Sequence, residues 1–386
     1  MLSTAFFSSL LLLLPLTSAL YTPQRTISGD DFFPSFDFFS GPDPTNGFVS
    51  YLSREDAIST SLVALADHSL ANNSVYIGVD STSVLSTSGP GRASVRLHGK
   101  EKFTHGLITV DIYHAPTGCG LWPAIWMVDP TGTYPGSTGE IDIFEYVHDS
   151  PRNSVTLHTS EGCKITNTTS ASSPAPPPSR LRPRADTSSQ SQAMSGHTES
   201  LNCYVNAPEQ TYNKGCSIAS PPFVSTPASP GKPNQSQRLP VPPSFATAGQ
   251  DFNAQNGGMY ALLWTSEKIE VYFFPRPMIP EALAIPSDGV TTAEGRSVNP
   301  NEWRAQGFSP VAVFEGCDFD AHIKELSLVV NTDFCGDWAG NEGVWEGSGC
   351  KAKTGVGSCE EYVAGKPGEF EGAYWLLGGV EVWGES

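Results

Sequence analysis

The chain has 386 residues, which suits one large β-sandwich or two smaller domains. Glycine and proline are abundant, at 37 and 32 residues, and only 16% of the residues are charged, a composition that favours β-structure. Forty acidic residues against 22 basic ones give a formal net charge of −18. This charge argues against nucleic acid or an anionic membrane as a partner, and it suits a neutral or cationic substrate.

The first 19 residues have the features of a signal peptide. Their apolar stretch is too short to span a bilayer, and it is followed by the small residues Thr17, Ser18 and Ala19. We therefore expect a mature chain that starts near Leu20 and is secreted, either extracellular or in the cell wall. No later apolar run approaches the length of a membrane span, so we expect no membrane partner.

Eight cysteines follow the expected cleavage site: Cys119, Cys163, Cys203, Cys216, Cys317, Cys335, Cys350 and Cys359. An even number in a secreted chain predicts disulfides, although eight cysteines allow about 105 pairings and the sequence selects none of them. The irregular spacing, with no C-x-x-C motif, argues against a zinc site. Sequons at Asn72, Asn167 and Asn234 are candidates for glycosylation.

Short segments of alternating apolar and polar residues predict strands at 94–98, 108–113, 155–158 and 326–330. Turn residues separate them, and the only helix signal is a short one near Arg54. The pattern predicts an all-β fold, a sandwich or jelly roll. Two Pro/Ser-rich stretches, at about 166–200 and 220–246, lack periodicity and are expected to be disordered. Because strand signals and cysteines bracket both, we interpret residues 20–386 as a single domain with two insertions.

The segment GEIDIFE at 139–145 places three carboxylates in an apolar, β-prone run. Side chains alternate along a strand, so Glu140 and Asp142 share one face. Glu145 is at an odd offset, and one extra residue near Ile143–Phe144, a β-bulge, would bring it back to that face. A pair of carboxyl groups beside a scissile bond is the equipment for glycoside hydrolysis. The alternative is that the acids form the solvated face of a strand.

Aromatic and polar side chains elsewhere are candidates for contacts with a sugar. Trp122 and Trp126 lie four residues apart, and on a strand they would share a face on which sugar rings can stack, unless both are core residues. His158 alternates with apolar neighbours, and Arg96 could hold hydroxyls or orient a carboxylate, or form a surface salt bridge. Trp264, at the end of an apolar run, is as ambiguous as the tryptophan pair.

Taken together, these motifs resemble the secreted fungal endo-1,3(4)-β-glucanases, or laminarinases, of glycoside hydrolase family 16. Besides GEIDIFE, the matching segments are FFSGPDPTNGF (38–48), GCGLWPAIW (118–126), LHTS (157–160), WTS (264–266), FFPR (273–276), FCGDWAG (334–340) and AYW (373–375). In this order they cover roughly 35–375 apart from the two insertions, and the ordered set is much more specific than the acidic motif alone.

The resemblance implies a concanavalin A-like β-jelly-roll sandwich with a substrate cleft on its concave face, and a retaining mechanism. It implies that Glu140 is the nucleophile, Glu145 the general acid/base and Asp142 the residue that orients them, with Arg96, Trp122, Trp126, His158 and Trp264 binding β-glucan. We expect a monomer without cofactor or metal. Tyr146 follows the motif where relatives often have glycine, and is expected to alter the edge of the cleft.

Three other functions fit some of these residues. A transglycosylase would use the same acids and pass the sugar to another sugar instead of to water. A non-catalytic sandwich would bind β-glucan with the acids as a solvated face. A metal site could be built from Glu140, Asp142 and Glu145, because hard cations accept carboxylates, but the tryptophan-rich surroundings favour sugar.

Overall fold

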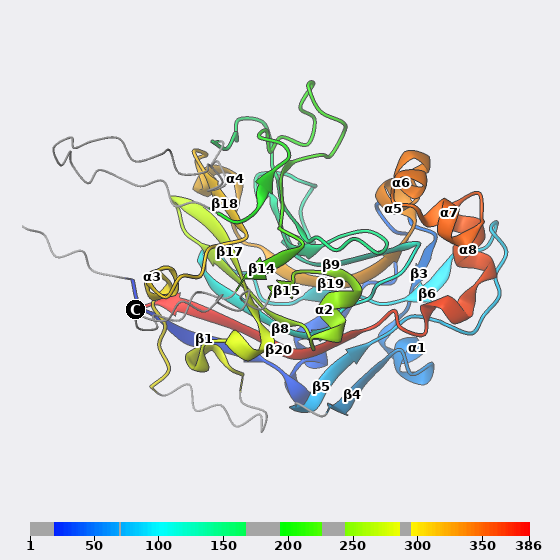
Figure 1. Ribbon diagram of the computed structural model, residues 1–386, viewed down its shortest axis with the longest axis horizontal. Coiled ribbons are helices and arrows are strands. Elements are labelled where there is room, and N and C mark those ends of the chain that lie inside the picture. Colours follow the sequence, from blue (N-terminus) through cyan, green and yellow to red (C-terminus); the bar gives the residue numbers. More distant parts are fainter. Residues whose placement is uncertain (1–18, 69–70, 167–193, 226–243, 286–294) are drawn as a thin grey trace, which may run out of the picture.

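In the computed structural model, the chain forms a sandwich of two large antiparallel sheets (Figure 1). The structure describes residues 19–68, 71–166, 194–225, 244–285 and 295–386. The expected signal peptide thus lies almost entirely outside the described residues. Among the described residues, no helix combines the length and the apolar character needed to cross a membrane.

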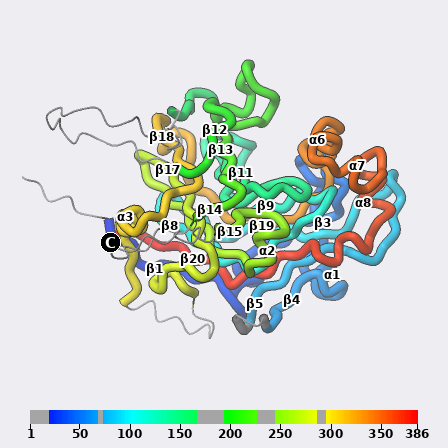
Figure 2. The backbone as a smooth tube through the Cα atoms, in the orientation of Figure 1, coloured from blue at the N-terminus to red at the C-terminus, as the bar shows by residue number. Residues whose placement is uncertain are grey.

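Sheet A holds the strand order β18-β17-β16-β8-β20-β5-β4, with β1 paired to β20. The bounds of these strands are Ala312–Glu315 (β18), Lys268–Pro275 (β17), Gly258–Trp264 (β16), Gly106–His114 (β8), Trp375–Glu385 (β20), Ala71–Ile77 (β5), Val63–His68 (β4) and Tyr21–Ile27 (β1). The first and last strands lie side by side in the backbone trace (Figure 2).

Sheet B holds the order β12-β13-β11-β10-β9-β19-β7-β2. Its strands are His197–Thr198 (β12), Cys216–Ala219 (β13), Ser154–His158 (β11), Glu140–Glu145 (β10), Leu121–Val128 (β9), Ser327–Phe334 (β19), Arg96–Gly99 (β7) and Phe36–Phe38 (β2). Two small pairs complete the β-structure, Phe223–Ser225 (β14) with Ser244–Ala246 (β15) and Val49–Tyr51 (β3) with Arg92–Ser94 (β6).

The main hydrophobic core lies between the two sheets and follows the alternation in the sequence. Ile108, Val110 and Ile112 of β8 face it from sheet A, while Ile125 and Met127 of β9 face it from sheet B. These side chains are almost completely buried, so their apolar surface supplies most of the driving force for closing the sandwich. The all-β prediction and its strands are confirmed.

Short helices decorate the sandwich: Arg54–Ser59 (α1), Gly249–Ala254 (α2), Pro300–Ala305 (α3), Phe319–His322 (α4), Gly336–Ala339 (α5), Glu342–Gly347 (α6), Cys350–Thr354 (α7) and Cys359–Gly365 (α8). The helix expected near Arg54 is confirmed, whereas α5–α8 were not predicted from the sequence. These four gather at one end beside β3 and β6 (Figure 1). Two disulfides, Cys119–Cys350 and Cys335–Cys359, tie them to the sandwich.

Two further disulfides join Cys163 to Cys317 and Cys203 to Cys216, so all eight cysteines are paired, as predicted. The predicted disorder is wrong at the margins of both Pro/Ser-rich stretches. There β12, β14 and β15 pair with neighbouring strands, because Met194 and Ala246 find buried sites. The remainder of both stretches, 167–193 and 226–243, lies outside the described residues.

Candidate active site

The three carboxylates lie on β10, and a β-bulge brings them to one face. Asp142 pairs with Trp126 of β9, but Phe144 pairs with the adjacent Ile125, so Ile143 is the extra residue. Ile143 and Phe144 both point into the core between the sheets and are fully buried. The predicted bulge is therefore confirmed, and Glu145 returns to the face of Glu140 and Asp142.

A buried asparagine holds the bulge in place. The Oδ1 of Asn153 accepts a hydrogen bond from the backbone N–H of Glu145 at 2.8 Å, and its Nδ2 donates to the carbonyl of Ile143 at 2.9 Å. The side chain thus satisfies two backbone groups next to the irregular pairing. Asn153 is fully buried, and it fixes the backbone that carries Glu145.

His158 on β11 pairs directly with Glu140. Its Nε2 lies 3.2 Å from Asp142 Oδ2 and 3.8 Å from Glu140 Oε1. Tyr134 Oη lies 3.2 Å from the same Glu140 oxygen. Glu140 is therefore contacted by both an imidazole and a phenol, and Asp142 by the imidazole.

Burial raises the pKa of all three acids. Desolvation is the main cause for Glu140, followed by the charge of Asp142, and together they raise its pKa to about 8. Desolvation alone raises the pKa of Asp142, also to about 8. For Glu145, desolvation and then Asp142 act in the same direction, while the hydrogen bond from Trp122 opposes them. Three adjacent carboxyls therefore retain protons at a pH where isolated ones would be fully ionised.

Both tryptophans of β9 lie on this polar face, as predicted, while Leu121, Ile125 and Met127 are buried on the other. Trp122 donates from Nε1 to Glu145 Oε1 at 2.7 Å. Trp126 donates from Nε1 to the Oδ1 of Asn331, a β19 residue, at 2.7 Å. Both indole rings are partly exposed and can present a face to a ligand.

Arg96 lies beside this row. Its guanidinium carbon is 5.0 Å from the centre of the Trp126 ring and 5.1 Å from that of Phe39, so it is stacked between aromatic faces. It also lies 3.6 Å from the buried carboxylate of Asp43. Arg96 is therefore a buried residue that packs on Trp126, and not part of a surface salt bridge.

Two expectations about aromatic residues are wrong. Trp264 ends β16 in sheet A and is fully buried in the core between the sheets. It packs edge-to-face on His105 instead of facing the acids. The alternation of β16 could not reveal this, because it does not say which sheet a strand joins.

Tyr146 does not form the edge of a cleft. It is 1% exposed, packs edge-to-face on Phe144, and donates its hydroxyl to the carbonyl of Pro116 at 2.6 Å. The bulge explains this position, because it turns Glu145 to the polar face and leaves the next residue directed into the core. A bulky side chain is therefore accommodated away from the acids.

Four site residues escaped the sequence reading: Tyr134, Asn153, Asn213 and Asn331. Tyr134 and Asn213 lie in segments without periodicity, and Asn153 comes just before a strand, so alternation gave no signal for them. Asn331 could have been found by extending the alternation of the 326–330 strand by one residue, since it shares the face opposite Val330.

Glu140, Asp142 and His158 also each present one potential metal-ligand atom, all within 4.8 Å of one another. The alternative metal site considered from the sequence, built from three acids, would thus contain the His158 imidazole in place of Glu145. An imidazole hydrogen-bonded to a carboxylate produces the same close approach, and we assign these groups no metal.

The comparisons with known proteins agree with this geometry. Residues 36–222 and 184–383 match the model of the XgeA-like, catalytic GH16 domain. The chain is 34% identical over 377 residues to a probable endo-1,3(4)-β-glucanase of Aspergillus niger, covering 96% of this chain but 41% of that protein. The chain spans about half the length of most of the curated relatives it matches.

Two solved structures are similar over their whole length. Laminarinase 16A of Phanerochaete chrysosporium, with β-glucans in its donor and acceptor sites, has a TM-score of 0.71 and 31% identity, covering 95% of this chain and 100% of that one. An elongating family 16 β-1,3-glucosyltransferase has a TM-score of 0.69 and 35% identity, covering 94% and 100%. The chain therefore belongs to glycoside hydrolase family 16, in its XgeA-like catalytic group.

Proposed function

We propose that the protein is an endo-acting glycoside hydrolase that cleaves β-1,3 and mixed β-1,3/1,4 glucans with retention of configuration. The observation that carries this proposal is the gathering of Glu140, Asp142 and Glu145 on one face of a bulged strand, beside two partly exposed tryptophans. The curated name of the A. niger relative and the glucan bound to the Phanerochaete laminarinase support the substrate class.

In the first step, the Glu140 carboxylate attacks the anomeric carbon. The bond from that carbon to the leaving glucan oxygen breaks, and Glu145 gives its proton to that oxygen. In the second step, the Glu145 carboxylate removes a proton from water, the water oxygen bonds to the anomeric carbon, and Glu140 leaves as a carboxylate. The raised pKa of Glu145 suits the first role, because the group must arrive protonated.

Asp142 lies between the two catalytic acids in sequence and contacts His158 at 3.2 Å. We assign it the role of holding the imidazole and of raising the pKa of both glutamates through its charge. Trp122 would offer a stacking surface and keep Glu145 oriented. Trp126 would extend the sugar-contacting row, and the buried Arg96 would hold the Trp126 ring in place. Because Glu140 and Asp142 are buried rather than solvated, a purely sugar-binding sandwich explains the acids less well.

The test is incubation of the purified protein with laminarin, lichenan, xyloglucan and chitin, followed by identification of the products. Laminarin and lichenan should be shortened, and proton NMR should detect the β-anomer first. Glu140→Gln should lose several orders of magnitude in rate and still bind laminari-oligosaccharides. The control Glu101→Gln, at an exposed surface ion pair with Arg25, should keep the wild-type rate. Activity of Glu140→Gln at the wild-type rate would refute the assignment.

A transglycosylase is the second candidate, and the similarity to an elongating glucosyltransferase is the observation that favours it. Both reactions pass through the same glycosyl-enzyme and differ in whether water or a glucan hydroxyl captures it. With laminari-oligosaccharides at low concentration, where water outcompetes sugar acceptors in a hydrolase, a transglycosylase still yields products longer than the substrate from the earliest times. A hydrolase yields mainly shorter ones under these conditions.

We further propose that the protein is secreted as a monomer, since four disulfides suit an oxidising compartment. Intact mass with and without reductant should differ by eight hydrogens. Free thiols in secreted material, or a dimer on gel filtration with light scattering, would contradict this proposal.

A further inference from the structure

The loop closed by the Cys203–Cys216 disulfide reaches the catalytic acids by two contacts. Asn213 Oδ1 lies 2.8 Å from the hydroxyl of Tyr134, which in turn contacts Glu140. Gly215 packs so closely on the His158 ring that a Cβ there would lie 2.9 Å from Nδ1. The loop is therefore a wall of the site on the side of Glu140 and His158.

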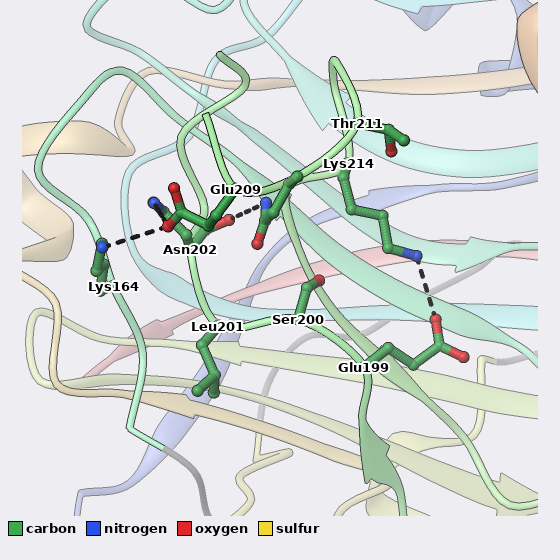
Figure 3. A pocket seen from close by; sticks show the side chains of 9 residues that line it. Lys164, Glu199, Ser200, Leu201, Asn202, Glu209, Thr211 and Lys214 are labelled. Atoms are coloured by element: carbon green, nitrogen blue, oxygen red, sulfur yellow. Dashed lines mark hydrogen bonds and ion pairs between the residues drawn. The ribbon is translucent and has the colours of Figure 1, made fainter. Parts of the chain in front are cut away.

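Polar contacts within the loop and to the residues just before it brace the loop that carries Asn213. Asn202 donates to Glu209 at 2.7 Å, and the Gln210 amide donates to the carbonyl of Gly215 at 3.1 Å. Lys214 pairs with Glu199 at 3.5 Å (Figure 3). These side chains line a cavity of about 630 Å³ that none of the catalytic acids lines. We assign no ligand to the cavity, because its charged side chains already form ion pairs, Lys164 with Glu209 and Lys214 with Glu199.

The hydroxyl of Tyr134 has a single hydrogen but two oxygen neighbours. Glu140 Oε1 is 3.2 Å away and Asn213 Oδ1 is 2.8 Å away, and the hydroxyl can donate to only one of them. Tyr134 is 40% exposed as a residue, but desolvation around its hydroxyl, and then the charges of Glu140 and Asp142, raise the pKa of the phenol well above its usual range, so the hydrogen stays on the phenol. The phenolic hydrogen can therefore point either to Glu140 or to Asn213.

The amide of Asn213 can settle that direction. With its oxygen towards Tyr134, as in this structure, the amide takes the phenolic hydrogen away from Glu140, an arrangement that suits a protonated Glu140. After a rotation of 180°, the amide nitrogen donates to the phenolic oxygen, and the phenol donates to an ionised Glu140. The two arrangements therefore differ in the charge of Glu140 that they favour.

We propose that Asn213 and Tyr134 form a positioning pair, in which the orientation of the Asn213 amide determines whether Tyr134 hydrogen-bonds the Glu140 carboxylate. This inference rests on the proposed function, because it takes Glu140 as the nucleophile. In the free enzyme described here, the phenolic hydrogen is directed to Asn213. When Glu140 ionises for attack, the amide would turn and the phenol would donate to the carboxylate. In the glycosyl-enzyme, where the Glu140 oxygen is esterified and uncharged, the hydrogen would return to Asn213, and it would move back as Glu140 leaves.

Other charged groups also face Glu140 and influence the pKa that the test measures. Asp142 and Glu145 on the same strand raise its pKa, while His158 on β11 lowers it. A variant must therefore alter the Tyr134 hydroxyl or its partner and leave these three residues in place.

The test is a titration of Glu140 by ¹³C NMR in protein labelled at glutamate carboxyl carbons, with the signal identified by its absence from Glu140→Gln. Tyr134→Phe removes the donor and should raise the Glu140 midpoint by about half to one pH unit. Asn213→Asp turns the amide into an acceptor only, and should raise it similarly. Asn213→Gly leaves Tyr134 free to donate, and should move it by less than about 0.3 unit. Aspartate and glycine both tolerate the positive φ of 58° at this position.

Two results separate this mechanism from a simple charge effect. In the Tyr134→Phe background, Asn213→Asp should raise the midpoint by less than half as much as it does alone. Tyr212→Phe, one residue away and exposed, is the matched control and should not move it. The acid limb of kcat/KM should shift in parallel.

An unchanged midpoint in Tyr134→Phe, or equal effects of Asn213→Asp with and without the phenol, would overturn the proposal. If Tyr134→Phe fails to fold, equal midpoints for Asn213→Asp and Asn213→Gly overturn it. Failure of the wild type to hydrolyse laminarin would count against the proposed function alone, since the titration needs no substrate.

Discussion

Asn153 holds the bulge that positions Glu145, so its replacement should lower both the stability of the protein and the rate of the reaction. Asn153→Ala leaves the Ile143 carbonyl and the Glu145 N–H without their partners, at 2.9 Å and 2.8 Å in the intact protein. A buried carbonyl without a partner costs about 1–3 kcal/mol, and a lost hydrogen bond at a partly buried N–H costs about 0.5–1.5 kcal/mol. We therefore expect the free energy of unfolding to fall by about 2–4 kcal/mol.

The same change should slow the reaction, because the bulge no longer fixes the backbone of Glu145. A displacement of about 1 Å in a catalytic group can cost about 100-fold in rate, so kcat on laminarin should fall by about 10- to 100-fold with little change in KM. Aryl glycosides with good leaving groups should lose less, since they need little protonation from Glu145.

Urea denaturation gives the stability, and initial rates below the unfolding transition give kcat. Asn299→Ala, which removes a helix N-cap hydrogen bond at α3, is the control that should cost stability without a change in kcat. A folded Asn153→Ala with the wild-type kcat would refute the role given to the bulge. So would an equal rate loss on laminarin and on activated aryl glycosides.

Other variants test the electrostatics and the close packing of the site. Trp122→Phe removes the hydrogen bond that lowers the pKa of Glu145, so the alkaline limb of kcat/KM should move up by about half to one pH unit, and an unmoved limb would count against that bond. The folded pKa of Glu140 is raised, so its contribution to stability is present below its unfolded pKa and is lost as the pH rises towards 8. Glu140→Gln should therefore raise the free energy of unfolding relative to the wild type by about 1–3 kcal/mol more at pH 8 than at pH 4, and a pH-independent difference would contradict this expectation. Gly215→Ala forces a Cβ to within 2.5 Å of the Leu157 carbonyl at a positive φ, and should lower the melting temperature by several degrees in calorimetry.

Much of the acid cluster could be predicted, because it depends only on the alternation of side chains along one strand and on one extra residue, the bulge. Glu140, Asp142 and the bulge follow from the pattern of β10, and Trp122 and Trp126 from that of β9. Trp264 shows the limit of this reasoning. An alternating run gives the faces of a strand but not the sheet that it joins, so a core tryptophan of sheet A looked like a sugar platform.

The partners that arrive from loops could not be predicted at all. Tyr134 and Asn213 are 79 residues apart, and only the Cys203–Cys216 loop and the pairing of β11 with β13 bring them together. Disulfide pairing could not be predicted for the same reason, since Cys119 joins Cys350 at a separation of 231 residues. Such contacts depend on the closed fold and leave no local periodicity.

The identity of the nucleophile is tested most directly by trapping the glycosyl-enzyme. A laminaribiosyl fluoride with fluorine in place of the reacting sugar's 2-hydroxyl slows breakdown of the intermediate, so the sugar stays bound to the attacking carboxylate. Mass spectrometry of the digested protein should locate one disaccharide adduct on Glu140, within the peptide that contains residues 139–145. An adduct on Glu145 or on another residue, or release of the α-anomer from laminarin with no adduct at all, would contradict a retaining reaction through Glu140.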